Sequence, residues 1–190
     1  MTYSILENYL KSKGDFTNND VNYITNHFKL KKVKKKEIII DFNQVSNAFY
    51  FVNKGALRIF TINKKGVELT RFFTFENSFC TALPSFIDQK PACEYFQAIE
   101  PSELLEIKRN DFYKLVDQYS DFDKIYREIL ERSFINNQKR IYSFQGYAAI
   151  DKLKLLLETY PDFLIRVPNN LTASYLGISP STLSRLKSKL

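Results

Sequence analysis

Apolar residues change their spacing twice along this chain. Between Leu30 and Lys108 they form short runs rich in β-branched and aromatic residues, separated by turn residues such as Asn53-Lys54-Gly55. On either side of that stretch they recur every three or four residues. Closely spaced short strands with Gly and Asn between them are typical of an antiparallel sandwich or jelly roll, and the wider spacing is typical of amphipathic helices. We therefore predict an α+β protein in which helices precede and follow an antiparallel β-roll.

The N-terminal helices and the strands can be placed more closely. Residues 1–28 predict two short helices, the second capped by Thr17 and running through Phe28. After the strands, Asn110 or Asp111 is the predicted cap of a further short helix. Within residues 56–63, strand alternation predicts that one face carries Leu57, Ile59 and Thr61 and the other carries Arg58, Phe60 and Ile62.

A long helix is predicted from about Asp121 to Ser143, with Gly146 as a hinge after it. Its broad apolar face comprises Phe122, Ile125, Tyr126, Ile129, Leu130, Phe134, Ile141 and Phe144. Such a helix can pack on the roll and also on its own copy in a C2 dimer. Asn137 lies inside the stripe, where it either sets the dimer register, touches a ligand, or is a solvated interruption. A further helix is predicted over residues 149–160, ended by Pro161.

The segment from Pro168 to Leu190 predicts a helix-turn-helix. Ala173 is a small residue where two helices cross closely, and Gly177 supplies a left-handed helix end. Ser179 is the predicted N-cap of the second helix, with Pro180 at its first position. The small core between the two helices is predicted to contain Leu176, Ile178, Leu183 and Leu186.

The opposite face of the second helix is polar and basic. Ser181, Thr182, Arg185 and Lys189 recur at helical spacing, opposite Leu183, Leu186 and Leu190. From Phe163 onward there is no Asp or Glu, and the basic residues there are Arg166, Arg185, Lys187 and Lys189. Neutralising phosphates requires this bias. The alternative is an ordinary helical hairpin with a basic, solvated end.

Composition narrows the function classes. The 190 residues carry a formal net charge of +7, which suits nucleic acid or an anionic membrane surface. No run of 18 apolar residues and no signal-peptide pattern occurs, so a cytoplasmic protein without membrane contact is predicted. Cys80 and Cys93 are expected to stay reduced. His27 stands alone, so neither a metal site nor a cofactor is predicted, and a jelly-roll enzyme lacks its ligand cluster.

The run from Lys29 to Glu37 contains six lysines. Lysines flanking the first strand of a sheet protect its edge and keep it soluble. A direct DNA contact is the alternative, and we favour the solvated edge.

Three segments together make the chain resemble a bacterial Crp/Fnr-type transcriptional regulator. FYFVNKGALRIFTINKKGVELTRFF (49–73) is similar to the strand–turn–strand of that family's cyclic-nucleotide-binding-like roll, and SELLEIKRNDFYKLV (102–116) to the exit of the roll. NLTASYLGISPSTLSRL (170–186) resembles its DNA-reading element, with Ser179, Thr182 and Arg185 at the contact positions. The resemblance implies double-stranded DNA as partner, a homodimer, an unidentified small-molecule effector, and RNA polymerase as a further partner.

Two departures from the family pattern matter. Cyclic-AMP-binding members carry a Gly-Glu pair and, about ten residues later, an Arg next to Ser or Thr. In this chain Ala92-Cys93 stands where the Arg is expected, and residues 78–80 contain no Gly-Glu pair. A phosphate without that arginine loses a bidentate contact, so control by cyclic AMP is not predicted. An oxygen-sensing cysteine set and a haem ligand are also absent from the sequence. Family members commonly continue into a β wing after the second helix, whereas this sequence stops at Leu190, either because the wing is absent or because the sequence is truncated.

The sequence therefore predicts a dimeric, sequence-specific DNA-binding transcription regulator. Its domains are predicted as a β-roll effector-type domain with N-terminal helices (1–120), a dimerisation helix (121–145) and a helix-turn-helix domain (146–190). The alternative is a small-molecule sensor or protein-interaction module whose β-roll does the work. Predicted DNA-binding residues are Ser179, Ser181, Thr182, Arg185, Lys187 and Lys189, and candidate effector-binding residues facing the roll's interior or lying on the long helix are Asn77, Ser78, Cys80, Cys93 and Asn137.

Overall fold

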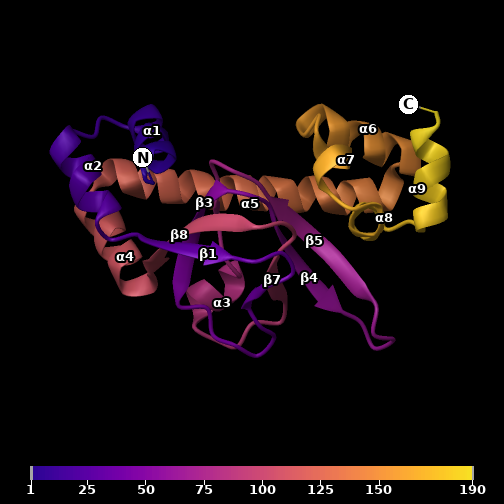
Figure 1. Cartoon of the computed structure of the whole chain (residues 1–190), viewed down its shortest axis with the longest axis horizontal. Coiled ribbons are helices and arrows are strands. Elements are labelled where there is room, and N and C mark those ends of the chain that lie inside the picture. Colours follow the sequence, from indigo (N-terminus) through magenta and orange to yellow (C-terminus); the bar gives the residue numbers. More distant parts are fainter. Residues whose placement is uncertain (1, 190) are drawn as a thin grey trace. The chain divides into compact units, whose positions relative to one another are not determined.

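The structure is a computed structural model that describes residues 2–189, so Met1 and the apolar position predicted at Leu190 lie outside the described residues. Two helices precede the strands, one interrupts them, and six follow them within the described part (Figure 1). The helices are α1 (Ser4–Lys13), α2 (Asn18–Thr25), α3 (Leu83–Asp88), α4 (Arg109–Gln118), α5 (Ser120–Gly146), α6 (Ala149–Thr159), α7 (Phe163–Arg166), α8 (Asn169–Leu176) and α9 (Pro180–Lys187).

The strands of the described residues form two four-stranded sheets. One has the order β1-β8-β3-β6 and the other β2-β7-β4-β5. The paired strands whose register is known, such as β3 with β8, run antiparallel, which confirms the predicted α+β class with its antiparallel roll. The strands are β1 (Lys29–Val33), β2 (Ile38–Ile40), β3 (Ala48–Lys54), β4 (Leu57–Ile62), β5 (Glu68–Thr74), β6 (Phe79–Cys80), β7 (Tyr95–Ala98) and β8 (Ser102–Lys108).

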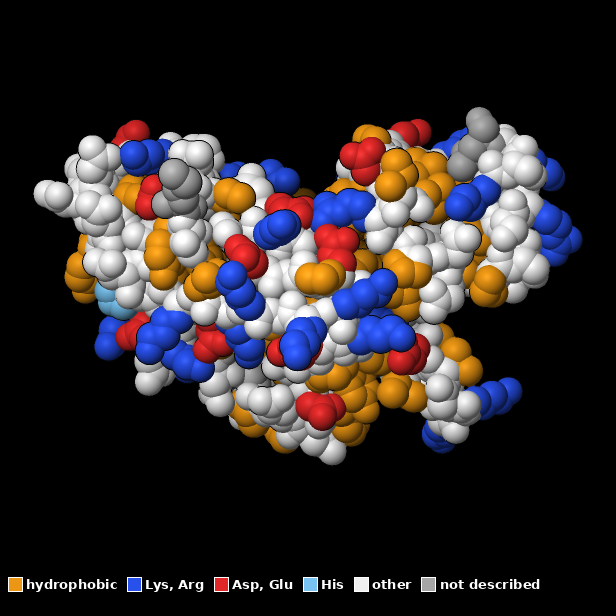
Figure 2. Space-filling view, viewed as in Figure 1, with side chains coloured by type: hydrophobic (Ala, Val, Ile, Leu, Met, Phe, Trp, Pro, Cys, Tyr) orange, Lys and Arg blue, Asp and Glu red, His pale blue; other side chains and the backbone are white. Residues whose placement is uncertain are grey.

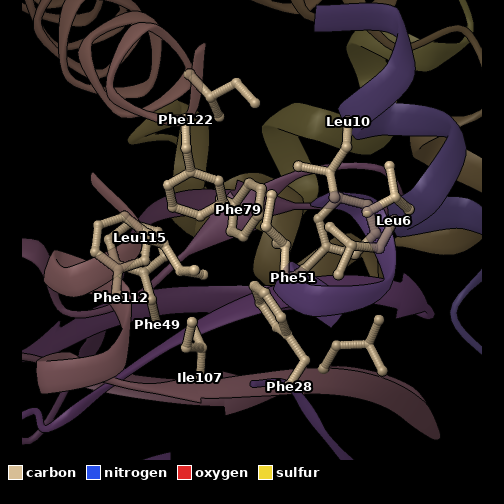
Figure 3. Close-up of a cluster of buried hydrophobic side chains, with 14 of the residues drawn as sticks. Leu6, Leu10, Phe28, Phe49, Phe51, Phe79, Ile107, Phe112, Leu115 and Phe122 are labelled. Carbon is tan, nitrogen blue, oxygen red and sulfur yellow. The ribbon is translucent and has the colours of Figure 1, made fainter. Parts of the chain in front are cut away.

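An aromatic core joins the first sheet to the helices around it (Figure 3). The rings of Phe49 on β3 and Phe112 on α4 stack with their centroids 4.8 Å apart. Phe122, at the start of α5, meets the Phe112 ring edge-on at 5.5 Å. All three side chains are almost completely buried. Burying aromatic rings of this size contributes a large share of the stability of a domain, and it fixes the start of α5 against the roll.

The lysine run lies at a sheet edge, as predicted. Strand β1 is the outermost strand of its sheet and pairs only with β8 among the described strands. The Lys31 ammonium lies 3.7 Å from a Glu106 carboxylate oxygen, and that of Lys32 lies 3.4 Å from Glu103. These lysines therefore protect the edge and pair with acids of the neighbouring strand.

The helix boundaries confirm one predicted cap and correct another. Thr17 forms a capping box with Asp20, whose side chain accepts a hydrogen bond from the Thr17 N–H at 2.9 Å. The hydrogen bonds from Thr17 lower the pKa of the Asp20 carboxyl. The prediction of Asn110 or Asp111 as the next cap was wrong, because α4 begins at Arg109, directly after β8, with no side-chain cap. The extension of the second helix to Phe28 was also wrong, since α2 ends at Thr25.

Strand β4 is covered on both of its faces over most of its length. Leu57, Arg58, Ile59 and Phe60 are all buried, and Ile62 at the end of the strand is 46 % exposed. The Nε of Arg58 donates to the Gln97 side chain on β7 at 2.8 Å. Arg58 is therefore a buried polar residue that a side chain of the neighbouring strand satisfies.

By internal contacts the chain divides into two compact units. The N-terminal unit consists of Met1–Ile59 and Phe73–Glu131, and the C-terminal unit of Phe60–Phe72 and Arg132–Leu190. The C-terminal unit thus combines the second half of α5 and helices α6–α9 with the outer part of strands β4 and β5. We call residues Phe60–Phe72 the β4–β5 hairpin.

Candidate nucleic-acid interface

The first helix of the predicted helix-turn-helix ends at Gly177. Gly177 has a φ of 69°, in the left-handed region. The Ile178 N–H donates to the Ala173 carbonyl at 3.0 Å, and the Gly177 N–H donates to the Ser174 carbonyl at 3.3 Å. This pair of hydrogen bonds is the Schellman motif, which satisfies carbonyls that the helix end would leave unpaired. Ala173, at 1 % exposure, is buried at the crossing of the helices.

Gly177 is also held by a contact that the sequence did not reveal. A Cβ atom at this position would lie 2.6 Å from Cε1 of Phe144 on α5. No real side chain tolerates so short a distance. The turn of the helix-turn-helix therefore packs directly on the end of the long helix, within the C-terminal unit.

Helix α9 begins as the sequence predicts. The Ser179 Oγ accepts a hydrogen bond from the Thr182 N–H at 3.0 Å, and Pro180 occupies the first helical position. The hydroxyls of Ser181 and Thr182 each lie 2.8 Å from the Ser179 Oγ. Ser179 thus fixes the first turn of α9 and orders two hydroxyls at the exposed end of the helix.

The basic face of α9 points away from the core of the unit. Leu183 is fully buried, whereas Ser181, Arg185 and Lys189 are exposed. Lys and Arg side chains gather along the outer side of α9 (Figure 2). The Nε of Arg185 lies 3.4 Å from the Ser181 carbonyl of its own helix.

The six predicted DNA-binding residues are brought together on α9 and its two flanks. Thr182 is partly buried, and the Lys187 ammonium donates to the Asn169 side chain on α8 at 3.1 Å. A binding role for these residues stays a prediction.

Helix α8 is bonded to strand β5, which is remote from it in sequence, and contacts Arg140 of α5. The Ser174 Oγ accepts from the Thr70 N–H and donates to the Glu68 carbonyl, both at 2.9 Å. The Arg140 guanidinium on α5 donates to the Thr70 carbonyl at 2.9 Å and lies 4.4 Å from the centroid of the Tyr175 ring. Burial lowers the pKa of Arg140. Strand β5 is thereby fastened to α8 and α5, an arrangement for which the sequence contains no local signal.

The candidate effector-binding residues, unlike the DNA-binding candidates, do not lie on one element. Cys80 is buried in strand β6, where desolvation raises the pKa of its thiol. Ser78 is half-buried. Asn77 and Cys93 are exposed, so the prediction that they face the interior of the roll was wrong. Asn77 has a φ of 60°, in the left-handed region that asparagine tolerates better than most residues. Asn137, on the second half of α5, is also exposed.

Ala92, which stands where the resemblance places a phosphate-binding arginine, is buried and bonded through its backbone. Its carbonyl accepts from the Asn43 N–H at 2.9 Å, and its N–H donates to the Gln44 carbonyl at 3.0 Å. The side chain there offers no charge to an anion. Arg58 is buried in β4, but its Nε already donates to Gln97.

Comparison with known proteins identifies the architecture. Residues 30–119 match the family of the cyclic nucleotide-binding domain. The Thermus thermophilus catabolite activator protein is 19 % identical with a TM-score of 0.61, over 96 % of this chain and 86 % of that one. FixK2 from Bradyrhizobium japonicum is 16 % identical with a TM-score of 0.75, over 86 % and 84 %. A putative Crp/Fnr-family transcriptional regulator from Eubacterium rectale is 19 % identical with a TM-score of 0.70, over 96 % and 87 %.

No curated protein sequence matches the chain significantly. Among residues 2–189, no helix combines the length and the apolar character that crossing a membrane would require.

Proposed function

We propose that this chain, which contains a cyclic nucleotide-binding domain and has the fold of the Crp/Fnr-type transcriptional regulators, is itself a sequence-specific DNA-binding transcription regulator. The observation that carries the proposal is the geometry at Gly177 and Ser179. There a Schellman turn and a capped helix present an exposed basic surface in a segment without acidic residues. A helix held in this way is the element that enters the major groove in helix-turn-helix proteins.

The residues of α9 take different roles in this proposal. Arg185 makes a bidentate contact to a guanine, and Ser181 touches a base edge or a phosphate. Thr182, Lys187 and Lys189 contact phosphates, which fixes the register without reading sequence. Ser179 shapes the first turn and presents its hydroxyl network to the backbone.

The second half of α5 is proposed to pair two copies of the chain. Phe134 is 63 % exposed and Ile141 is 49 % exposed, although both belong to the apolar stripe of the helix. Exposed apolar side chains aligned on one helix indicate a surface that another helix covers. Pairing about a two-fold axis would set the two α9 helices in successive major grooves, about 34 Å apart, over a near-palindromic site.

Selection from random duplexes at near-physiological salt tests the proposal. We expect enrichment of a two-fold symmetric site. Arg185→Ala should weaken binding by about 1–3 kcal/mol and relax discrimination at one base pair of each half-site. Lys35→Ala, which removes an exposed positive charge from the roll, is the matched control. An absence of any enriched site, or an unchanged preference in Arg185→Ala, would contradict the proposal.

The effector question has its own test. We propose that cyclic AMP does not control this chain, because Ala92 supplies no charge to a phosphate and is closely bonded to Asn43 and Gln44. Titration calorimetry with cyclic AMP should give no binding heat, and the selected duplex should bind equally with and without the nucleotide. Saturable binding at micromolar concentration would contradict this.

The second candidate function is a sensor or protein-interaction module whose roll does the work. The match of residues 30–119 to a ligand-binding domain family favours it. The acid-free basic segment that contains α8 and α9 favours the regulator. A protein with a defined ligand or protein partner but without salt-dependent affinity for DNA would decide for the module. RNA polymerase stays a predicted partner of the regulator.

A further inference from the structure

The β4–β5 hairpin has a turn whose shape is fixed by one side chain. The Oδ1 of Asn63 accepts from the N–H groups of Lys65 and Val67, at 2.9 and 3.0 Å. The Asn63 N–H donates to the Val67 carbonyl at 3.0 Å, and Gly66 closes the turn with a φ of 76°. An asparagine side chain that accepts hydrogen bonds from the backbone of the following residues stabilises a defined turn conformation. The tip of the hairpin therefore presents its side chains from a fixed position.

Two consecutive lysines occupy that tip. Lys64 and Lys65 are both exposed, and within residues 2–189 neither forms an ion pair. Figure 2 shows positively charged side chains at the end of the hairpin that Figure 1 labels by β4 and β5. Lys31 and Lys32 of the roll, by contrast, pair with glutamates of β8. The charge at the tip is thus available to an outside anion.

The hairpin is attached to the helix-turn-helix. Ser174 on α8 holds the main chain of β5 through two hydrogen bonds of 2.9 Å, to Thr70 and Glu68. Arg140 adds a third to the Thr70 carbonyl, also at 2.9 Å. Ser174 precedes Gly177 by only three residues, so the same short helix carries both the turn before α9 and the hairpin. The tip lysines and the basic face of α9 therefore belong to one compact unit.

We propose that Lys64 and Lys65 form a second DNA contact, binding the phosphate backbone beside the half-site that α9 reads. The inference rests on the proposed function, which it extends by a residue pair outside the helix-turn-helix. Lysine is a compact, flexible charge that attracts phosphate without distinguishing bases. The contact therefore adds affinity and salt dependence, but no sequence preference.

The sign of the charge favours DNA over a protein partner for this tip. The hairpin also exposes Ile62, Val67 and Leu69, and apolar side chains could instead be covered by a second copy of the chain. These residues lie in the strands or at their ends, whereas the tip itself carries only Asn, Lys and Gly. The hairpin tip and the basic face of α9 are both positively charged and belong to the same unit. One DNA molecule could therefore bind to both surfaces.

The test compares the Lys64→Ala/Lys65→Ala double variant with the wild-type protein on the selected duplex. The slope of log affinity against log salt should decrease by about 0.9 for each lysine that no longer neutralises a phosphate, or about two units for each hairpin engaged. The enriched sequence should stay the same. Removing the base pairs that flank the selected site should weaken binding by the wild-type protein as much as the double substitution does. The double variant should bind the trimmed and the full duplex equally.

Two further variants control the experiment. Lys34→Ala/Lys35→Ala removes the same charge from exposed positions in the turn between β1 and β2, and it should leave the slope and the flank dependence unchanged. Ser174→Ala removes the side chain that holds β5, so the effect of removing the tip lysines should be smaller in that background. Such non-additivity is the sign that the lysines act through the attachment of the hairpin.

The outcomes separate the inference from the function on which it rests. A wild-type protein that binds the duplex, with a double variant of the same slope and flank dependence, overturns the inference and leaves the proposed function standing. An equal decrease of the slope in the Lys34/Lys35 control also overturns it, because net charge alone would then be responsible. A change in dimer dissociation without a change in DNA affinity would assign the tip to a protein contact instead. A wild-type protein that binds no DNA overturns both proposals.

Discussion

Helix α5 passes through both compact units and presents its apolar stripe differently in each. In the N-terminal unit Phe122 and Ile125 are buried, in contact with the aromatic core of the roll. In the C-terminal unit Phe134 and Ile141 continue the same stripe but are about half exposed or more. One amphipathic pattern therefore serves two purposes. The first half secures the roll, and the second half leaves apolar side chains exposed, which we propose a second copy of the chain covers.

Charge differs between strand β1 and the segment that contains α8 and α9. Lys31 and Lys32 of β1 are paired with Glu106 and Glu103 on the neighbouring strand, whereas the segment from Phe163 onward contains no acid. A charge paired within the fold contributes little to binding, since its field is neutralised locally. Charge without acidic residues around it attracts a polyanion. The contrast between strand β1 and this segment shows that the location of lysines, more than their number, indicates where nucleic acid would bind.

The largest effect is expected in the aromatic core. Phe112→Ala removes a buried ring that contacts both Phe49 and Phe122, and it should lower the free energy of unfolding by about 3–5 kcal/mol. Phe134→Ala is the control, and in the monomeric protein it should change stability by less than about 0.5 kcal/mol. Urea denaturation at low protein concentration measures both. Equal decreases would mean that the two halves of α5 are buried alike.

The next effect concerns the turn before α9. Gly177→Ala should destabilise the C-terminal unit by about 2 kcal/mol, because a left-handed conformation alone costs roughly 1–2 kcal/mol and the new Cβ displaces the Phe144 ring. Gly66→Ala is a matched control, since that glycine also has a positive φ but no atom within 4 Å of its added Cβ.

Gly177→Ala should lower the free energy of unfolding more than Gly66→Ala does, and the difference is the cost of the contact with Phe144. Adding Phe144→Ala to Gly177→Ala should restore part of the stability. If the second substitution restores no stability, the close approach of the Phe144 ring is not the cause of the destabilisation. Thermal unfolding followed by circular dichroism, together with affinity for the selected duplex, provides the measurement.

The exposed half of α5 should affect association. Phe134→Ala combined with Ile141→Ala should weaken the proposed dimer at least tenfold, about 1.4 kcal/mol, because apolar anchors at the centre of an interface carry most of its energy. Analytical ultracentrifugation over a concentration series measures the dissociation constant. A dimer that is unaffected by both substitutions would place the interface elsewhere.

The smallest effect is expected from removing the side chains that cap α2 and α9. Ser179→Ala and Thr17→Ala each remove a side chain that accepts a hydrogen bond from a backbone N–H, and each should cost about 1 kcal/mol. Only Ser179→Ala should also reduce DNA affinity, because it loosens the first turn of α9. Equal reductions of DNA affinity in both variants would show that global stability, and not the cap of α9, is being measured.

Much of the C-terminal element could be predicted because its signals are local. Gly177, Ser179 and Pro180 each favour one backbone conformation whatever surrounds them, and α8 ends and α9 begins where those residues predict. The roll was predicted as a class for the same reason, from short β-rich runs between turn residues. The resemblance to Crp/Fnr-type regulators is confirmed in the fold and in the domain at residues 30–119.

Short elements and side-chain directions were predicted less well. The helices α3 and α7, of six and four residues, are too short to show a periodic pattern. Asn77 and Cys93 were placed inside the roll from an alignment of spacing, but a turn and a loop expose them. Strand alternation indicated which residues of β4 share a face, but not that both faces are covered and that Arg58 is buried.

The sequence alone determined the class of fold, the helix-turn-helix and the basic, acid-free character of its outer face, because backbone propensity and composition act over a few residues. Only the tertiary structure decided that Ser174 and Arg140 hold the β4–β5 hairpin and that Phe144 packs on Gly177. Those contacts join residues up to 106 positions apart. Such contacts depend on how whole elements pack, and no local pattern encodes them.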